Sequence, residues 1–367
     1  MADNYLEKMA GILVDHSARI QPGDRVAIEA TTAAAPLVRA LYTLILERGG
    51  HPHLLLDLPD QDFLLFTHAK SEQLDFIPTF RKLAYEQFES RIRILSSVNP
   101  RALTNVDPAK HKRWQKTNSP ILEAQMHRGA EGIFKWVTTL FPTEGYAMEA
   151  EMSLVEFENI VYHACHADEQ DPVKFWKAAE ENQATLIKRL EGHNQVVLRG
   201  PNVDMTLSIK GRRFINGAGL TNMPDGEIYT GPVEESVNGW IRFNYPAIYN
   251  GVMVEGVELT FSNGKVSQAS AKKNNPFLLE MLESDSGARY VGEFAIGTND
   301  SIERFLHNIL FDEKLGGTIH LALGAGYIES GSKNKSMIHW DMICGMQKDS
   351  EIQVDGQVVY KDGKPVK

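Results

Sequence analysis

The chain of 367 residues is poor in cysteine, with only two, and this excludes a fold held together by a framework of disulfides. It also lacks a surplus of basic residues, because 38 Lys and Arg stand against 48 Asp and Glu, a formal net charge of −10. A nucleic-acid-binding protein is expected to be basic, so that class is disfavoured. No apolar run reaches the roughly 18 residues that a membrane span requires. The sequence therefore predicts neither a nucleic-acid nor a membrane partner.

Internal repeats and low-complexity segments are also missing. The N-terminal segment does not have the basic stretch followed by an apolar run that marks a signal peptide, and this predicts a cytoplasmic location. What remains is ordinary globular usage, with 43% hydrophobic and 23% charged residues. At about 100–200 residues per domain, this length favours two domains.

Residues 1–190 alternate between helical and strand patterns. Apolar strands are expected at 25–30, 51–57, 91–95 and 135–141, and helices at 5–18, 34–47, 71–90, from 119 to the fourth strand, and 172–190. Strands separated by helices are typical of a parallel sheet with helical crossovers. The loop after the first strand has no glycine-rich phosphate fingerprint, so no dinucleotide site is predicted. This half is predicted to be an α/β domain.

After Gly192 the strands become shorter and alternate between apolar and polar residues. Asn263-Gly264 is the strongest hairpin signal in the chain, and a final hairpin is expected at 354–363. Helices are expected at 276–285 and 300–310. We therefore predict a second domain, residues 191–367, that is mainly antiparallel β with a few helices.

Metal ligands are the first chemistry to consider, because the chain has 12 histidines. His163-x-x-His166 has the spacing of two ligands on a helix, but it lies in a segment with ordinary helical periodicity. His51 and His53 flank a proline in an expected strand. For all four, a surface or core role is favoured over metal binding.

The segment 292–341 has a different character. His320 and His339 lie at or near the ends of short apolar strands, beside glycine-rich turns. His339 and Asp341 are two residues apart, so a strand would point both side chains to one face, where they form a natural pair of metal ligands. Glu293 and His320 would complete a mixed carboxylate and imidazole set. The alternative is a set of polar residues at strand ends with ordinary hydrogen bonds.

Five motifs follow one another in the second half of the chain. They are Asn222-Met-Pro-Asp-Gly-Glu227 with Thr230-Gly-Pro232, Gly287-Ala-Arg289-Tyr-Val-Gly-Glu293, Asn308-Ile-Leu-Phe-Asp-Glu313, His320-Leu-Ala-Leu-Gly-Ala-Gly-Tyr327, and Asn334-Lys-Ser-Met-Ile-His339-Trp-Asp341. Each alone is weak, but together and in this order they are specific. With them the chain resembles the thermophilic aminopeptidase family of metallopeptidases, the aminopeptidase T and aminopeptidase S type. The resemblance covers the whole chain and is strongest over residues 220–345.

The resemblance implies a two-metal site made of two glutamates, two histidines, a tyrosine and an aspartate. Carried over motif by motif, these ligands fall on Glu227, Glu293, His320, Tyr327, His339 and Asp341. The chain departs from the family pattern at Asp225-Gly226, where the family often has Thr-Glu, and the length of the loop from Asp312 to His320 is a second point of departure. Neither removes a ligand.

Two divalent ions roughly 3.5–4 Å apart can share a bridging carboxylate and activate a water that attacks a peptide carbonyl. Zinc, cobalt, manganese and magnesium are the candidate ions, and the sequence leaves open which carboxylate bridges them. Tyr327 is expected to bind a metal or to donate a hydrogen bond to the tetrahedral oxyanion. Glu255, Glu258 and Glu313 are candidates for a general base, although each is more typical of a solvated surface carboxylate.

The function that the resemblance implies is a cytoplasmic, homodimeric metal-dependent aminopeptidase that releases N-terminal residues from peptides. The N-terminal domain would then restrict access to the site and carry no chemistry. One alternative is another metal-assisted amidase or esterase acting on a small metabolite. A non-enzymatic peptide-binding protein is the other, but loss of ligands would be its signature, and all six positions are filled.

Overall fold

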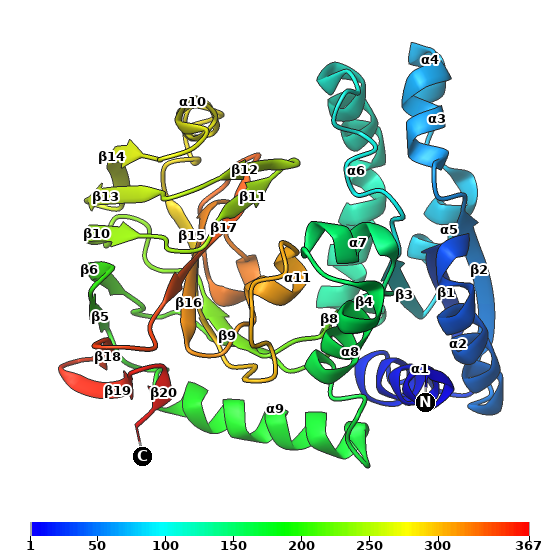
Figure 1. The fold of residues 1–367 in the computed structure, drawn as a ribbon, viewed down its shortest axis with the longest axis horizontal. Helices are drawn as coiled ribbons and strands as arrows, with labels where there is room; N and C mark the ends of the chain where they lie inside the picture. The colour runs from blue at the N-terminus through cyan, green and yellow to red at the C-terminus, as the bar shows by residue number, and fades with distance from the viewer. Residues whose placement is uncertain (1, 367) are drawn as a thin grey trace. The chain divides into compact units, whose positions relative to one another are not determined.

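The computed structural model describes residues 2–366, with the side chains of residues 4–366. The chain divides into two compact units (Figure 1). Unit 1 comprises Met1–Trp176 and Gly219–Pro224, and unit 2 comprises Lys177–Ala218 and Asp225–Lys367. The chain therefore passes from one unit to the other within α9 (Pro172–Lys188), returns at residue 219, and leaves again after residue 224. The sequence predicts a single boundary near residue 190, just after α9.

Unit 1 contains a five-stranded parallel sheet in the order β2-β1-β3-β4-β8. Its strands are β1 (Arg25–Thr31), β2 (His51–Asp57), β3 (Ser90–Leu95), β4 (Lys135–Leu140) and β8 (Asn222–Met223). The first four confirm the predicted parallel α/β architecture. The fifth was not predicted, because β8 is two residues long and comes from a distant part of the sequence.

The helices of unit 1 largely follow the predicted pattern. They are α1 (Ala2–Gly11), α2 (Ala35–Glu47), α3 (Gln61–His68), α4 (Ser71–Leu74), α5 (Thr79–Gln87), α6 (Pro108–Ala130), α7 (Glu144–Glu149) and α8 (Leu154–Ala164). The helix predicted at 71–90 is wrong in its continuity, because Pro78 separates α4 from α5. Helix α6 begins earlier than predicted, since the side chain of Asp107 accepts a hydrogen bond from the amide of Ala109 and Pro108 fits the first turn.

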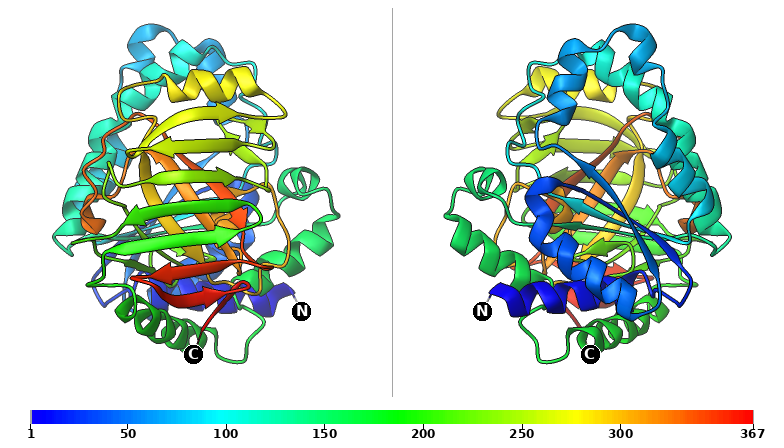
Figure 2. Two further views of the ribbon diagram at one scale, coloured as in Figure 1. Left: turned by 90° about the vertical axis from the view of Figure 1, so that its left-hand side faces the viewer. Right: turned by 90° about the vertical axis from the view of Figure 1, so that its right-hand side faces the viewer.

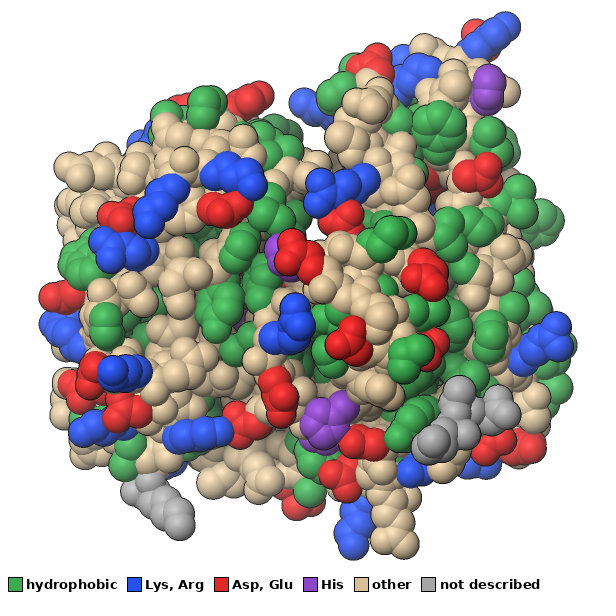
Figure 3. Space-filling view, viewed as in Figure 1, with side chains coloured by type: hydrophobic (Ala, Val, Ile, Leu, Met, Phe, Trp, Pro, Cys, Tyr) green, Lys and Arg blue, Asp and Glu red, His purple; other side chains and the backbone are tan. Residues whose placement is uncertain are grey.

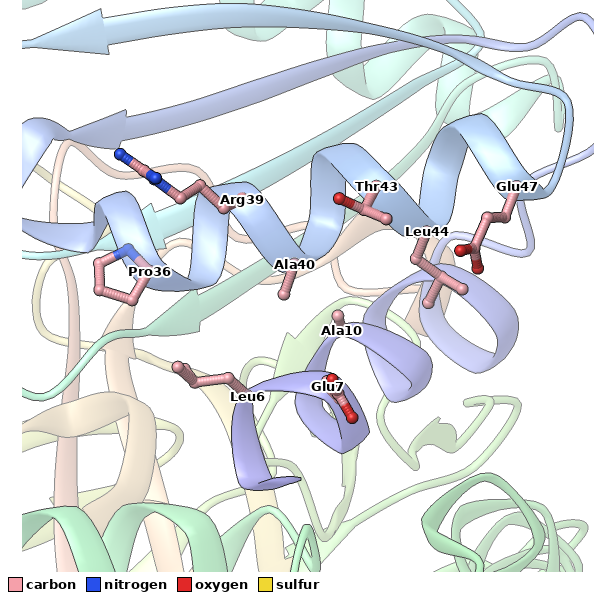
Figure 4. Close-up of a pocket in the computed structure, with 9 residues that line it drawn as sticks. All are labelled: Leu6, Glu7, Ala10, Pro36, Arg39, Ala40, Thr43, Leu44 and Glu47. Atoms are coloured by element: carbon pink, nitrogen blue, oxygen red, sulfur yellow. The ribbon is translucent and has the colours of Figure 1, made fainter. Parts of the chain in front are cut away.

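A pocket of about 480 Å³ lies between α1 and α2 (Figure 4). Its lining combines small and apolar side chains with three charged ones, Glu7, Arg39 and Glu47. It contains no histidine or cysteine, the ligands that transition metals prefer together with carboxylates. The predicted metal chemistry therefore lies elsewhere.

Unit 2 is built on two antiparallel sheets, as the sequence predicts. The larger sheet, seen face-on in the left view of Figure 2, consists of β14 (Lys265–Ser270), β13 (Glu258–Ser262), β10 (Asn238–Arg242), β6 (Val203–Ser208), β5 (Gln195–Gly200), β18 (Glu351–Val354), β19 (Gln357–Lys361) and β20 (Lys364–Pro365). The smaller consists of β17 (His339–Gly345), β16 (Thr318–Gly324), β15 (Val291–Gly297), β9 (Glu227–Thr230) and β7 (Ile215–Gly217). A separate pair is formed by β11 (Ala247–Tyr249) and β12 (Val252–Val254).

The two large sheets share one apolar core. Leu198 and Met205 of the larger sheet belong to the same buried cluster as Phe294, Leu321 and Met342 of the smaller. Because side chains alternate along a strand, the opposite face of the smaller sheet is free to carry polar groups. That face carries the candidate site.

The turns of unit 2 follow the sequence signals more closely than its helices do. Asn263 and Gly264 both have positive φ, 50° and 80°, and join β13 to β14, which confirms the predicted hairpin. Helix α10 (Asn275–Leu282) also agrees with the prediction. The helix predicted at 300–310 is wrong, since only α11 (Ile309–Asp312) forms there. The buried carboxylate of Asp312 accepts hydrogen bonds from the amides of Leu306 and Asn308, which holds the preceding residues in a turn.

Within residues 2–366, no helix has both the length and the apolar character needed to cross a membrane. On the face shown in Figure 3, Lys and Arg side chains are interspersed with Asp and Glu and form no continuous basic stripe.

Candidate metal centre

Four neighbouring strands, β9, β15, β16 and β17, bring most of the predicted ligands to one face of the smaller sheet. In the antiparallel register, Glu293 and Asp341 both lie opposite Ala322, and His320 lies opposite Ala295. Residues directly opposite each other share a face, so these three side chains point the same way. The small alanine side chains between them leave space above the sheet.

A β-bulge turns Glu293 towards this face. Val291 and Glu293 are two residues apart and would share a face in a regular strand, but the register of β15 shifts between them. As a result Val291 lies in the apolar core together with Phe294, while Glu293 faces the opposite side. The residue at the bulge is Gly292, where a Cβ would overlap the carbonyl oxygens of Gly324 and Ala325.

We expect Gly292→Ala to lower the free energy of unfolding by about 3 kcal/mol, because the added methyl group overlaps backbone atoms that cannot rotate away. Urea denaturation would measure the change. Gly11→Ala is the matched control, since a Cβ at that helical residue meets no atom within 4 Å. A Gly292→Ala protein as stable as the wild type would show that the bulge does not need glycine.

The imidazole and carboxylate atoms form two overlapping groups. His320 Nε2 lies 3.3 Å from Glu227 Oε2 and 3.5 Å from Glu293 Oε1. His339 Nε2 lies 3.3 Å from Glu293 Oε2 and 3.5 Å from Asp341 Oδ1. Glu293 thus directs one oxygen to each imidazole and belongs to both groups.

The two groups differ in depth. The side chains of His320 and Glu227 are 1% and 7% exposed, whereas that of His339 is 27% exposed. We call Glu227, Glu293 and His320 the deep half-site, and Glu293, His339 and Asp341 the shallow half-site. A small molecule can therefore reach the cluster more easily from the shallow half-site.

The charges of the cluster balance one another through protons when no ion is bound. Burial opposes protonation of His320, but its hydrogen bond to Glu293 and the charge of Glu227 raise its pKa to about 9. Burial would raise the pKa of Asp341, yet the neighbouring His339 lowers it to about 2. The cluster therefore attracts positive charge, whether a proton or a cation.

The orientation of His339 is set by the backbone. Its Nδ1–H donates a hydrogen bond to the carbonyl of Ala325 at 2.8 Å, which orients the ring so that Nε2 faces the carboxylates and can bind a cation in place of its proton. Such a bond on the far nitrogen is typical of histidines that bind metal. His320 is different, because its buried Nδ1 has no hydrogen-bond partner among the described residues.

Tyr327 lies beside the shallow half-site. Its ring centroid is 5.1 Å from that of His339 and 5.3 Å from that of Tyr229. Burial raises the pKa of the phenol well above its usual value, and the charges of Glu293 and Asp341 raise it further. The hydroxyl is therefore neutral in the ion-free cluster and able to donate a hydrogen bond.

Of the three candidate general bases, only Glu313 lies at the cluster. The expectation of a solvated surface carboxylate is wrong for Glu313, because it groups with His320 and Asp341 and its side chain is only 14% exposed. Burial raises its pKa to about 8. The expectation holds for Glu255 and Glu258, which form ion pairs on the surface.

Sequence reasoning missed Lys314. Its side chain is completely buried, and Nζ donates hydrogen bonds to Glu227 Oε1 at 2.7 Å and to Glu313. Burial would lower the pKa of this ammonium, but the charges of Glu227 and Glu313 raise it well above the usual value, so the group is positively charged. The only signal in the sequence is the adjacency to Glu313, which is too common to reveal a buried lysine.

The other histidines singled out in the sequence lie outside these groups. His163 pairs with Asp168 at 2.7 Å, and His166 stacks on Phe175. His53 packs against the ring of Phe88. Neither pair belongs to a metal-competent group found among the described residues.

The amino-acid sequence is similar to those of several known aminopeptidases over almost its full length. The chain is 28% identical to "Aminopeptidase 2" of Geobacillus stearothermophilus, and the alignment covers 99% of this chain and 95% of the relative. It is 27% identical to "Aminopeptidase T" of Thermus thermophilus over 98% and 95% of the two chains, and 25% identical to "Aminopeptidase AmpS" of Bacillus subtilis over 99% and 97%.

The fold is also shared with a solved structure. The structure described as wild-type AmpT from Thermus thermophilus has a TM-score of 0.84 at 23% identity and covers 99% of both chains. The model of the family described as thermophilic metalloprotease (M29) matches residues 2–364. Because this match spans almost the whole chain, the chain belongs to the thermophilic metalloprotease (M29) family, as its motifs predict.

Proposed function

We propose that this protein is a metal-dependent aminopeptidase that releases N-terminal residues from peptides, with the acidic and imidazole cluster of unit 2 as its active site. The observation that carries the proposal is Glu293, which directs one carboxylate oxygen to each of two imidazoles. This is the arrangement that a carboxylate shared by two cations requires. Three relatives that match 98–99% of the chain are named aminopeptidases, which supports the choice of substrate.

The residues present fit two divalent ions. Ligand atoms about 2.0–2.2 Å from a tetrahedral ion lie roughly 3.3–3.5 Å apart, and the nitrogen-to-oxygen distances of both half-sites are 3.3 and 3.5 Å. Glu227 Oε2 and Asp341 Oδ1 are buried without a hydrogen-bond partner among the described residues. Unpaired buried carboxylate oxygens are costly, and a cation in each half-site would satisfy them. The mixed oxygen and nitrogen donors suit zinc, cobalt or manganese better than magnesium.

Bound ions would polarise the scissile carbonyl and lower the pKa of a water molecule. The protein's part is to hold the ligands rigidly on adjacent strands and to limit access to one side. Glu313 belongs to neither half-site, yet groups with His320 and Asp341, so its carboxylate is the candidate to accept the proton of the attacking water.

The test of this function is hydrolysis of leucyl-p-nitroanilide by protein stripped with a chelator and then refilled with cobalt, zinc, manganese or magnesium. We expect activity to return with at least one ion and to be absent in His339→Ala. His193→Ala is the matched control, because His193 is half-exposed in the same unit and, within the described part of the chain, pairs with Asp355. N-acetyl-leucyl-p-nitroanilide should resist cleavage, since an aminopeptidase needs a free amino group.

Binding of two ions without cleavage of any aminoacyl anilide would contradict the aminopeptidase proposal. Simple esters and other amides would then be the substrates to test, because the same ions could serve an esterase or amidase. Failure to bind any ion would contradict the metal centre itself.

The phenol of Tyr327 gives a further prediction. Tyr327→Phe keeps the ring contacts with His339 and Tyr229 and removes only the hydroxyl. We expect kcat to fall by about 10²-fold, the usual effect of losing one donor to a developing oxyanion, with the ion content unchanged. Steady-state kinetics and metal analysis would measure both quantities. Loss of one ion would instead identify Tyr327 as a ligand, and unchanged kcat would exclude either role.

We also propose that the protein forms a homodimer in the cytoplasm. Unit 1 exposes large aromatic side chains, with Phe76 62% and Phe80 77% exposed, which a second copy would cover. Both cysteines, Cys165 and Cys344, are buried and unpaired, as expected in a reducing compartment. Sedimentation at low protein concentration would distinguish the 41.1 kDa monomer from a dimer.

A further inference from the structure

Lys314 is a charged side chain in the interior of unit 2, and an ammonium group is expensive to bury without partners. Its side chain is 0% exposed. The carboxylates of Glu227 and Glu313 accept its hydrogen bonds, and the charge of Asp225, which is 1% exposed, also acts on it. A positive charge is thus held among the same carboxylates that would attract a metal ion.

The backbone around Lys314 is anchored on both sides. Its amide donates a hydrogen bond to the carbonyl of Phe311 at 3.0 Å, and its carbonyl accepts one from the amide of Asn299 at 3.0 Å. The side-chain amide of Asn299 donates in turn to the carbonyl of Asp225 at 2.8 Å. These hydrogen bonds fix the backbone of Lys314, so its ammonium group has little freedom to move away from the carboxylates.

The hydrogen bond from Lys314 occupies only one of the two carboxylate oxygens of Glu227. Oε1 accepts the hydrogen bond from Lys314 at 2.7 Å. Oε2 has no hydrogen-bond partner among the described residues and lies 3.3 Å from His320 Nε2. Glu227 can therefore offer one oxygen to an ion in the deep half-site, but not both.

Lys314 affects the two half-sites unequally. Among the described residues, its hydrogen bonds reach Glu227 of the deep half-site and Glu313, and none reaches Glu293, His339 or Asp341. A fixed positive charge repels a divalent cation more strongly at short range, and the effect is large where side chains exclude water. The ammonium contacts a ligand of the more deeply buried deep half-site directly, whereas its charge acts on Asp341 of the shallow half-site without a hydrogen bond.

We propose that Lys314 is a positioning residue that holds Glu227 as a one-oxygen ligand and makes the deep half-site the weaker of two unequal cation sites. The inference rests on the proposed two-ion function. At limiting metal, the first ion then occupies the shallow half-site, and the enzyme becomes fully loaded only when the free ion concentration is high enough to fill the deep one.

The test is titration of the full chain, stripped of metal, with cobalt against a chromophoric chelator. We expect two binding steps in the wild type that differ by at least about tenfold in affinity. Lys314→Met keeps an unbranched side chain, one atom shorter, and removes its charge, so the weaker step should tighten by at least about tenfold while the stronger step changes less than about threefold. Lys333→Met is the matched control, since Lys333 is exposed, and neither step should change.

A crystal grown with one equivalent of cobalt gives a second readout that needs no variant and covers the case in which Lys314→Met does not fold. Anomalous scattering should place the ion among Glu293, His339 and Asp341. An ion in the deep half-site first, or a weaker step that is unchanged or loosened in folded Lys314→Met, would overturn the inference while leaving the metal centre intact. A wild type that binds no cobalt would overturn the proposed function and this inference together.

Discussion

Glu293→Gln should abolish the binding of both divalent ions and lower kcat/KM for a leucyl anilide by at least about 10³-fold. Glu293 is the carboxylate that faces both imidazoles, at 3.5 Å from His320 and 3.3 Å from His339. Glutamine keeps the shape but replaces one oxygen with an NH₂ group that cannot bind a cation. Metal-ion stabilisation of the transition state amounts to several kcal/mol, and ~4 kcal/mol corresponds to about 10³-fold in rate.

Metal analysis of dialysed protein and steady-state kinetics would measure the two effects separately. Glu283→Gln is the matched control, because it makes the same substitution in the same unit at a side chain that is 70% exposed and paired with Arg289. We expect that control to keep its ions and its rate. A Glu293→Gln protein that retained both ions would show that another carboxylate joins the half-sites.

Removal of the ions should lower the melting temperature of the protein by roughly 10 °C. An ion present at about 1,000 times its Kd stabilises the folded state by ~4 kcal/mol, and each kcal/mol shifts Tm by about 2–4 °C for a domain the size of unit 2. The physical reason is that the ions neutralise carboxylates that are almost fully buried, with Glu293 5% and Glu227 7% exposed. Without ions, protons on the imidazoles replace only part of that charge.

Differential scanning calorimetry with and without chelator would check this shift. The Glu293→Gln protein provides the control, since chelator should leave its Tm unchanged if it has already lost its ions. If chelator did not alter the Tm of the wild type, the ions would have no structural role, although they could still take part in catalysis.

The parts of the site that could be predicted from the sequence follow from short-range geometry and from motifs. The spacing of His339 and Asp341 places both on one face of a strand, and the structure has them there in β17. Spacing alone does not connect them to Glu227, which is far away in the chain. That connection came from the resemblance to a family, and the register of four adjacent strands gives it a physical basis.

The parts that could not be predicted depend on contacts between distant residues. Alternation along β15 would put Glu293 on the same face as Val291, and only the bulge at Gly292 separates them. Lys314 has no local pattern that distinguishes it from a surface lysine, because its burial depends on Glu227 in another strand. The prediction of a helix at 300–310 was wrong for a related reason. The buried carboxylate of Asp312 accepts hydrogen bonds from two backbone amides that would bond to backbone carbonyls in a helix.

The way the chain passes between its two units has a consequence for how such proteins can be recombined. Residues 219–224 belong to unit 1 although residues on both sides of them belong to unit 2, and β8 within them completes the parallel sheet beside β4. β8 ends at Met223, and only Pro224, Asp225 and Gly226 separate it from Glu227 of the candidate site. A chimera made by a single crossover near residue 190 would therefore join a sheet from one parent to an edge strand from the other. Evolution by exchange of whole domains is hindered here, because the parallel sheet of unit 1 must change together with β8, which is encoded far downstream.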